Sequence, residues 1–116
     1  NAGFADANGV VIGDKIEIVT NGEISPIENI KCNPDGVLNR IDLQKQFGVI
    51  KTSNFGCIIG KIGEKGTPFL IGVNLTIISE NKGELYLGIN DNNLEDNSGE
   101  FLSIVTITVN TTIPAK

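Results

Sequence analysis

Hydrophobic and polar residues alternate along much of the chain, which is the pattern of strands that bury one face in a core. Residues 15–20 place Ile16, Ile18 and Thr20 on one face. The longest alternating run is residues 100–110, whose inner face would carry Phe101, Ser103, Val105, Ile107 and Val109. Further apolar or alternating runs predict strands over residues 47–51, 56–63, 69–72, 73–79 and 84–90.

Turn-forming residues separate these runs. Asn21-Gly22 and residues 80–83 predict tight turns. Residues 1–14 are expected to form an irregular lead-in or a first edge strand, and residues 23–46 a long functional loop. Apolar residues at positions 37, 38, 41, 43 and 47 fit either a short helical turn or an ordered part of that loop. Seven to eight short strands with little helix predict an all-β sandwich over residues 1–116, as a single domain.

Composition and charge exclude several functions. The net charge of −5 argues against nucleic-acid binding, because phosphate neutralisation needs clustered Lys and Arg. It also disfavours anionic lipid surfaces, and no apolar run approaches the roughly 20 residues of a membrane span, so we expect no membrane insertion. The chain opens at Asn1 without a signal peptide. We therefore expect a processed secreted protein, or a domain excised from a longer secreted protein, located outside the cell or on its surface.

The residues that usually carry catalysis are scarce. The chain has no His, which excludes Ser-His-Asp and Cys-His triads and the usual zinc sites. Its fourteen acidic residues could supply a carboxylate pair, but no pattern nominates one. We expect no enzymatic activity. Cys32 and Cys57 could form a disulfide or lie as two buried thiols, and the sequence leaves both alternatives open.

An acidic, Asn-rich segment over residues 90–99 is the strongest candidate for a functional site. It contains the carboxylates Asp91, Glu95 and Asp96 together with four Asn side chains. Calcium is held by six to eight such oxygens, and carboxylates crowded into one tight loop repel one another unless a cation or water screens them. The alternative is a solvated polar turn that binds no ion.

Four segments resemble the small calcium-dependent galactose-binding lectins of bacteria, of the LecA type. They are residues 16–22 (IEIVTNG), 55–63 (FGCIIGKIG), 87–91 (LGIND) and 96–101 (DNSGEF). Their order and spacing agree with the family over most of the chain, although residues 23–46 are not matched. The resemblance implies a jelly-roll-like β-sandwich of the galactose-binding-domain type, with Ca²⁺ at one end.

The resemblance also implies individual ligands. The implied metal ligands are the side chains of Asp91, Asp96 and Asn97, the carbonyl of Pro26, and the carbonyl of Asn93 or Leu94. Asp91 and Asn97 would also touch the sugar. The family's sugar pocket uses a His and a Gln, and at those positions this chain has no His but offers Gln44 or Gln46 and Phe47. The metal half of the site therefore matches better than the half that determines sugar specificity.

The expected function is a non-enzymatic, calcium-dependent carbohydrate-binding lectin domain of galactose type. A homo-oligomer is a further option, since lectins often strengthen weak single sites by multivalency. Two alternatives stay open. One is an accessory module of a larger exported enzyme or virulence factor, with structural Ca²⁺ or no metal and no sugar site. The other is a metal-free β-sandwich that serves as an interaction or structural domain.

Overall fold

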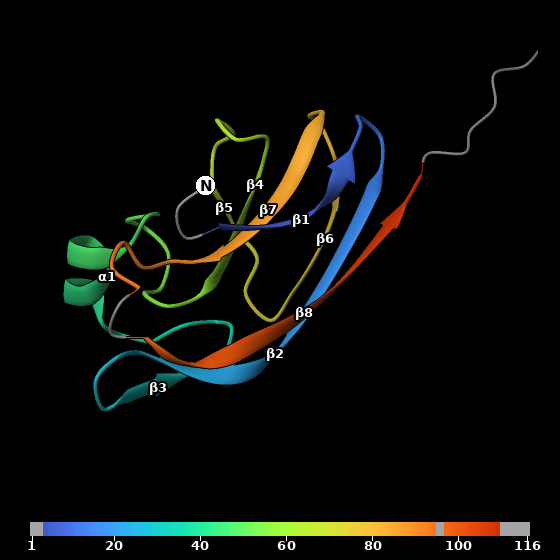
Figure 1. The fold of residues 1–116 in the computed structure, drawn as a ribbon. Helices are drawn as coiled ribbons and strands as arrows, with labels where there is room; N and C mark the ends of the chain where they lie inside the picture. The colour runs from blue at the N-terminus through green and yellow to red at the C-terminus, as the bar shows by residue number, and fades with distance from the viewer. Residues whose placement is uncertain (1–3, 95–96, 110–116) are drawn as a thin grey trace, which may run out of the picture.

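Two antiparallel four-stranded sheets form the molecule (Figure 1). The computed structural model describes residues 4–94 and 97–109. The first sheet has the strand order β1 (Phe4–Val10), β7 (Gly83–Ile89), β4 (Ile58–Ile62) and β5 (Phe69–Leu70). In the second sheet, β2 (Lys15–Ile27) pairs with β3 (Ile30–Cys32), β6 (Asn74–Ile78) and β8 (Ser98–Thr108). The predicted all-β sandwich is confirmed.

The main core lies between the two sheets and follows from the period-two patterning. Ile16 and Ile18 of β2 meet Ile58 of β4 and Leu85 of β7, and all four side chains are buried. Burial of this aliphatic surface is the main favourable contribution to folding. A second cluster packs at one end of the sandwich, beside the only helix in the described part of the chain, and contains Ile24, Cys32, Val37, Leu43 and Phe55.

The predicted turn at Asn21-Gly22 is wrong. β2 pairs with β8 without interruption from Lys15↔Thr108 to Ser25↔Ser98, so the chain stays extended through these residues. Gly22 has φ +119°, and a Cβ there would clash with the Glu100 carbonyl oxygen. The glycine therefore allows a close approach between two strands, which is the other common use of glycine inside a strand.

Residues 23–51 contain two further differences from the sequence-based expectations. The expected long loop over 23–46 is instead the end of β2, the strand β3 and the helix α1 (Ile41–Phe47), so the helical alternative is confirmed. The strand predicted over residues 47–51 is wrong, because Phe47 ends α1 and the chain then turns. Leu43 anchors α1 in the second core cluster, and packing of this kind stabilises a helix too short to persist alone.

The remaining strand predictions agree with β4 to β8 to within about two residues. The first edge strand expected before residue 15 is β1. Residues 111–116, for which the sequence predicts a tail or the start of a linker, lie outside the described residues. No helix among the described residues is long and apolar enough to cross a membrane.

Cys32 and Cys57 are buried free thiols, so the disulfide alternative does not hold. Burial raises the pKa of the Cys32 thiol to about 11, with a smaller contribution from the nearby charge of Glu23. Burial also raises the pKa of Cys57 to about 12. Both groups therefore behave as small apolar core residues rather than as reactive thiols.

Candidate functional site

The loop that follows β7 begins with a completely buried polar residue, Asn90. Its side-chain oxygen accepts a hydrogen bond from the Ile50 backbone N–H (2.7 Å). Its side-chain nitrogen donates to the carbonyl oxygens of Ile50 (3.0 Å), Ser53 (3.1 Å) and Asn54 (3.1 Å). Because the amide is satisfied on both atoms, Asn90 is a stable polar anchor that ties residues 50–54 to the end of β7.

Backbone hydrogen bonds hold the rest of this loop against α1 and the start of β4. The Asn92 N–H donates to the Phe47 carbonyl oxygen at the end of α1 (2.7 Å). The Asn90 N–H donates to the Cys57 carbonyl (2.8 Å), and the Gly56 N–H donates to the Asn90 carbonyl (3.0 Å). In Figure 1, α1 accordingly lies at the same end of the sandwich as the loop after β7. The loop is therefore positioned by α1, by residues 50–54 and by the segment that leads into β4.

Asp91 is the buried carboxylate of this loop, with 5% of its surface exposed. Its Oδ1 accepts a hydrogen bond from the Asn93 N–H (2.9 Å), which closes a local turn. The other carboxylate oxygen, Oδ2, lies beside the side-chain amide of Asn97. A carboxylate fixed in this way keeps its second oxygen in a defined direction, as a metal ligand requires.

Asn97 brings three polar groups together. With its amide nitrogen turned inward, Asn97 donates to the Pro26 carbonyl oxygen (2.7 Å) and to Asp91 Oδ2 (2.8 Å). With the amide turned the other way, its oxygen faces the same two oxygens. In this second orientation the Asn97 oxygen would repel the two nearby oxygens unless a cation lay among them. The nitrogen-inward orientation instead satisfies all three groups by hydrogen bonds, without an ion. The two orientations differ only by a rotation that exchanges the amide oxygen and nitrogen.

A small pit opens beside these groups. It has a volume of about 10 Å³ and is lined by Pro26, Ile27, Phe47, Phe55, Asp91 and Asn93. That volume is close to the space needed by one water molecule. Phe47 and Phe55 form a tilted aromatic pair with ring centroids 5.8 Å apart. The pit therefore combines one carboxylate and backbone carbonyls with an apolar, aromatic wall.

Five of the residues singled out from the sequence meet at this place: Pro26, Phe47, Asp91, Asn93 and Asn97. Leu94 lines a larger cavity between the sheets and not the pit, and its carbonyl accepts a hydrogen bond from the Asn97 N–H (3.2 Å). Asp96 and the neighbouring Glu95 lie outside the described residues.

The two glutamines do not line the pit. Gln44 donates from Nε2 to the Lys51 carbonyl oxygen (3.3 Å), which links α1 to the following turn. Gln46 is exposed, and its carbonyl oxygen accepts from Asn92 Nδ2 (3.4 Å). Both glutamines therefore lie on α1, outside the lining of the pit.

The donor set fits a hard cation only if amides and carbonyls contribute. Within residues 4–94 and 97–109, no three Asp, Glu or Cys side chains gather around a common point. Asp91, the Pro26 carbonyl and Asn97 are all oxygen donors of the kinds that bind calcium, and a carbonyl keeps a second lone pair for this purpose. These residues can therefore hold Ca²⁺, with further oxygens from water or a ligand.

The sequence marks Asn90 only as one of the four Asn of the loop, and not as a buried anchor. The alternation of β7 puts Leu85, Leu87 and Ile89 on one face, so residue 90 falls on the opposite face. Residues 50–54 cover it and supply its hydrogen-bond partners. The sequence does not show this role, because the covering segment lies about forty residues earlier in the chain.

The architecture, an antiparallel β-sandwich, also occurs in a solved structure. No model of a known protein family matches the chain, and no curated protein matches it. Among solved structures, it is similar to a chain described as "EclA N-terminal domain; PllA-like lectin", with a TM-score of 0.71. The alignment covers 92% of this chain and 88% of that chain at 21% sequence identity, a likeness that concerns the fold.

Proposed function

We propose that this chain is a calcium-dependent carbohydrate-binding domain that binds galactose-type sugars and performs no catalysis. The observation that carries the proposal is that the Asn97 amide lies 2.7 Å from the Pro26 carbonyl oxygen and 2.8 Å from Asp91 Oδ2. These groups come from the end of β2 and from both sides of the loop after β7. The similarity in fold to a PllA-like lectin supports the same reading.

Calcium would supply the main attraction for the sugar. Asp91, Asn97 and Pro26 would fill part of its coordination shell, and the carbonyl of Asn93 and the side chain of Asp96 are the proposed additional ligands. Because calcium takes six to eight oxygens, positions remain for two neighbouring sugar hydroxyls in place of water. Asp91 and Asn97 would also form hydrogen bonds with those hydroxyls, and bonds to a carboxylate are stronger than neutral ones.

Phe47 would provide the apolar contact. Its ring lines the pit and is held by Phe55, so one apolar face can meet the C–H groups of a sugar ring. Gln44 and Gln46, on α1 beside the pit, would supply hydrogen bonds to more distant hydroxyls. Phe47 therefore offers sugar specificity through stacking, and the glutamines offer it through polar contact at the edge of the pit.

A second function is favoured by a specific observation, namely the nitrogen-inward orientation of Asn97. In that orientation the amide satisfies Pro26 and Asp91 without any ion. The chain would then be a metal-free β-sandwich domain for structural support or interaction. A calcium response separates the two functions, because the metal-free domain has none.

Thermal melts of the protein in EDTA, in excess CaCl₂, and in CaCl₂ with single monosaccharides test the proposal. A ligand that binds only the folded state at about 100 times its Kd adds about 2.7 kcal/mol to the stability. For a domain of this size the melting temperature should rise by roughly 10 °C. We expect calcium to raise the melting temperature, and galactose to raise it further only when calcium is present.

Glucose and mannose serve as matched controls for galactose, and MgCl₂ serves as the control for calcium. A rise with calcium and none with any sugar would leave a structural calcium site and would contradict the lectin function. Identical melts in EDTA and calcium would contradict the calcium site and favour the metal-free domain.

A further inference from the structure

Strand β8 has one unpaired edge. Over the described residues it pairs with β2 and with no other strand. In an antiparallel pair, alternate residues direct their N–H and C=O groups to the partner and the others direct theirs away. About half of the backbone groups along the eleven residues of β8 therefore point out of the sheet.

This edge lacks the features that usually prevent strand addition. Residues 101–108 read FLSIVTIT and contain neither a charge nor a proline. The register with β2 is continuous over the whole strand, so no bulge turns the edge away. A long, uncharged and regular edge is the kind that pairs with another strand. The edge strand β6 of the same sheet is much shorter, with five residues.

Apolar side chains are left uncovered on both faces of β8. On the outer face, Leu102 is 70% exposed and Ile104 is 60% exposed. On the inner face, Phe101, Val105 and Ile107 are only half-buried, whereas Ile16 and Ile18 of the adjacent β2 are completely buried. The core is therefore covered at β2 and open at β8.

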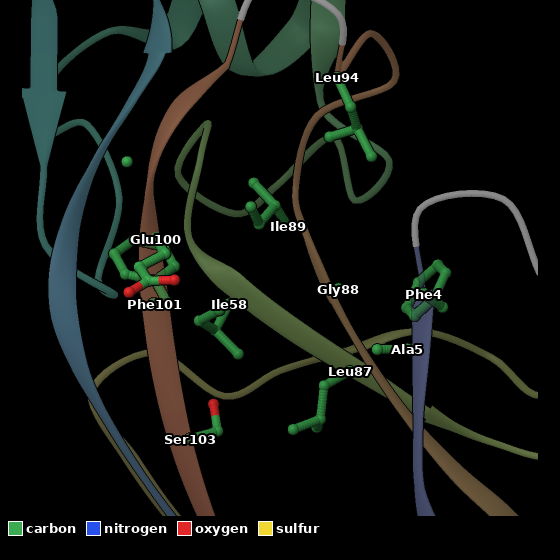
Figure 2. Close-up of a pocket in the computed structure, with 11 residues that line it drawn as sticks. Phe4, Ala5, Ile58, Leu87, Gly88, Ile89, Leu94, Glu100, Phe101 and Ser103 are labelled. Carbon is green, nitrogen blue, oxygen red and sulfur yellow. The ribbon is translucent and has the colours of Figure 1, made fainter.

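A cavity of about 600 Å³ lies along this open side. Figure 2 shows Phe101 and Ser103 of β8 on one side of it, with Ile58 and Leu87 behind and Phe4 of β1 on the other side. The lining is mainly apolar. The cavity thus extends the uncovered apolar surface from β8 towards β1, an edge strand of the first sheet.

We propose that the free edge of β8 pairs with β8 of a second copy of this chain, antiparallel about a two-fold axis near Ile104. The free backbone groups of a strand edge are satisfied by another strand, and the side chains of β8 are compatible with those of a second β8. In that register Leu102 faces Thr106, Phe101 faces Ile107, and Ile104 faces its own copy. Glu100 faces Thr108, so no like charges oppose one another. The two second sheets would then join into one continuous sheet.

A two-fold, self-complementary interface is the commonest way in which identical chains associate. The pairing would satisfy the free backbone groups of both strands at once and would cover Leu102 and Ile104 with their counterparts. A peptide strand from a different protein, or a small apolar molecule in the cavity, are the competing occupants. Both would leave the isolated chain a monomer.

Sedimentation velocity of the full chain tests the proposal, in EDTA and in calcium without sugar. We expect a mass of about twice 12.3 kDa for the wild type in both buffers. Ile104→Lys should give a monomer, because it places two charges opposite each other at the two-fold axis. Ile78→Lys is the matched control, since Ile78 is 58% exposed on the short strand β6, and this variant should remain a dimer.

A circular dichroism spectrum identical to that of the wild type would show that Ile104→Lys is folded. A monomeric wild type at all concentrations, or a dimer that survives Ile104→Lys, would overturn the proposal. Loss of dimerisation in Ile78→Lys as well would also overturn it, because the effect would not be specific to β8. These outcomes do not depend on calcium or sugar binding, so they are separate from the test of the proposed function.

Discussion

The end of the sandwich that carries α1 differs sharply from the side between β1 and β8. At the α1 end, buried polar groups form hydrogen bonds within the chain, as Asn90 and Asp91 do. At the β1 and β8 side, the uncovered groups are apolar side chains and an unpaired strand edge. The first arrangement suits a small polar ligand that meets fixed oxygens. The second suits a large partner that buries apolar area and completes a sheet.

The difference also predicts where the fold tolerates change. Side chains at the α1 end position the pit and are packed on all sides, so substitutions there should reduce both stability and binding. Side chains on the outer face of β8 contact little within one chain, so substitutions there should affect association alone. Substitutions at the two places should therefore differ in their effect on stability.

Phe55→Ala should cause the largest loss. Phe55 is completely buried in the second core cluster and also lines the pit. Removing a buried Phe typically costs about 3 to 5 kcal/mol of unfolding free energy. Urea unfolding in EDTA measures this cost. Leu102→Ala is the matched control on the open side and should change the stability of the monomer by less than about 0.5 kcal/mol; equal losses would remove the contrast.

Asn90→Ala should lower stability next. The substitution removes the side-chain partner of the Ile50 N–H and of the Ser53 carbonyl. Buried groups left unsatisfied cost about 1 to 3 kcal/mol. Residues 50–54 should also become more mobile, which faster amide hydrogen exchange of that segment would show. Asn74→Ala, at an exposed position on β6, should have no such effect.

Asp91→Asn should change the stability of the metal-free protein little and should abolish calcium binding. The amide oxygen can still accept the hydrogen bond from Asn93, so the unfolding free energy in EDTA should change by no more than about 1 kcal/mol. The calcium-dependent rise in melting temperature should vanish. Asp35→Asn is the matched control, since Asp35 also accepts a backbone hydrogen bond, from Val73, but lies away from the pit. An unchanged calcium response in Asp91→Asn would contradict the site.

The smallest effect concerns the two thiols. Burial raises the pKa of Cys32 from 9.0 to about 11, so the unfolded chain loses this proton first as the pH rises. Stability from this group is complete below pH 9 and declines between pH 9 and 11. The native protein should therefore resist thiol reagents at neutral pH, whereas urea-unfolded protein should react at both cysteines. Rapid reaction of the native protein would show that the second core cluster opens readily.

The sequence predicts the long strands well because a period of two is a local property. The alternation in residues 15–20 and 100–110 reappears as β2 and β8. It fails at Asn21-Gly22, where pairing with β8 overrides the local preference for a turn. It fails again at residues 47–51, where Phe47 ends α1 and the chain then turns. The short helix depends on the burial of Leu43, which the local pattern does not show.

The candidate site could be predicted only in part. Asp91, Asn93 and Asn97 are marked by the concentration of oxygen-bearing side chains in one loop. Pro26 carries no such mark, because only its backbone carbonyl takes part, and it was identified through the family resemblance. The role of Asn90 as a buried anchor was missed because its partners in residues 50–54 become neighbours only through the fold. The free edge of β8 likewise follows from strand order, which the alternation does not contain.

Titration calorimetry can establish whether this chain binds calcium and whether sugar binding depends on it. Calcium is titrated into chelator-treated protein, and galactose is then titrated into the calcium-loaded sample. We expect saturable binding of a single calcium ion per chain, abolished by Asp91→Asn and retained by Asp35→Asn, and galactose binding only after calcium has been added. Absence of saturable calcium binding to the folded wild-type protein would rule out the calcium site, and the nitrogen-inward amide of Asn97 would then describe a closed, metal-free loop.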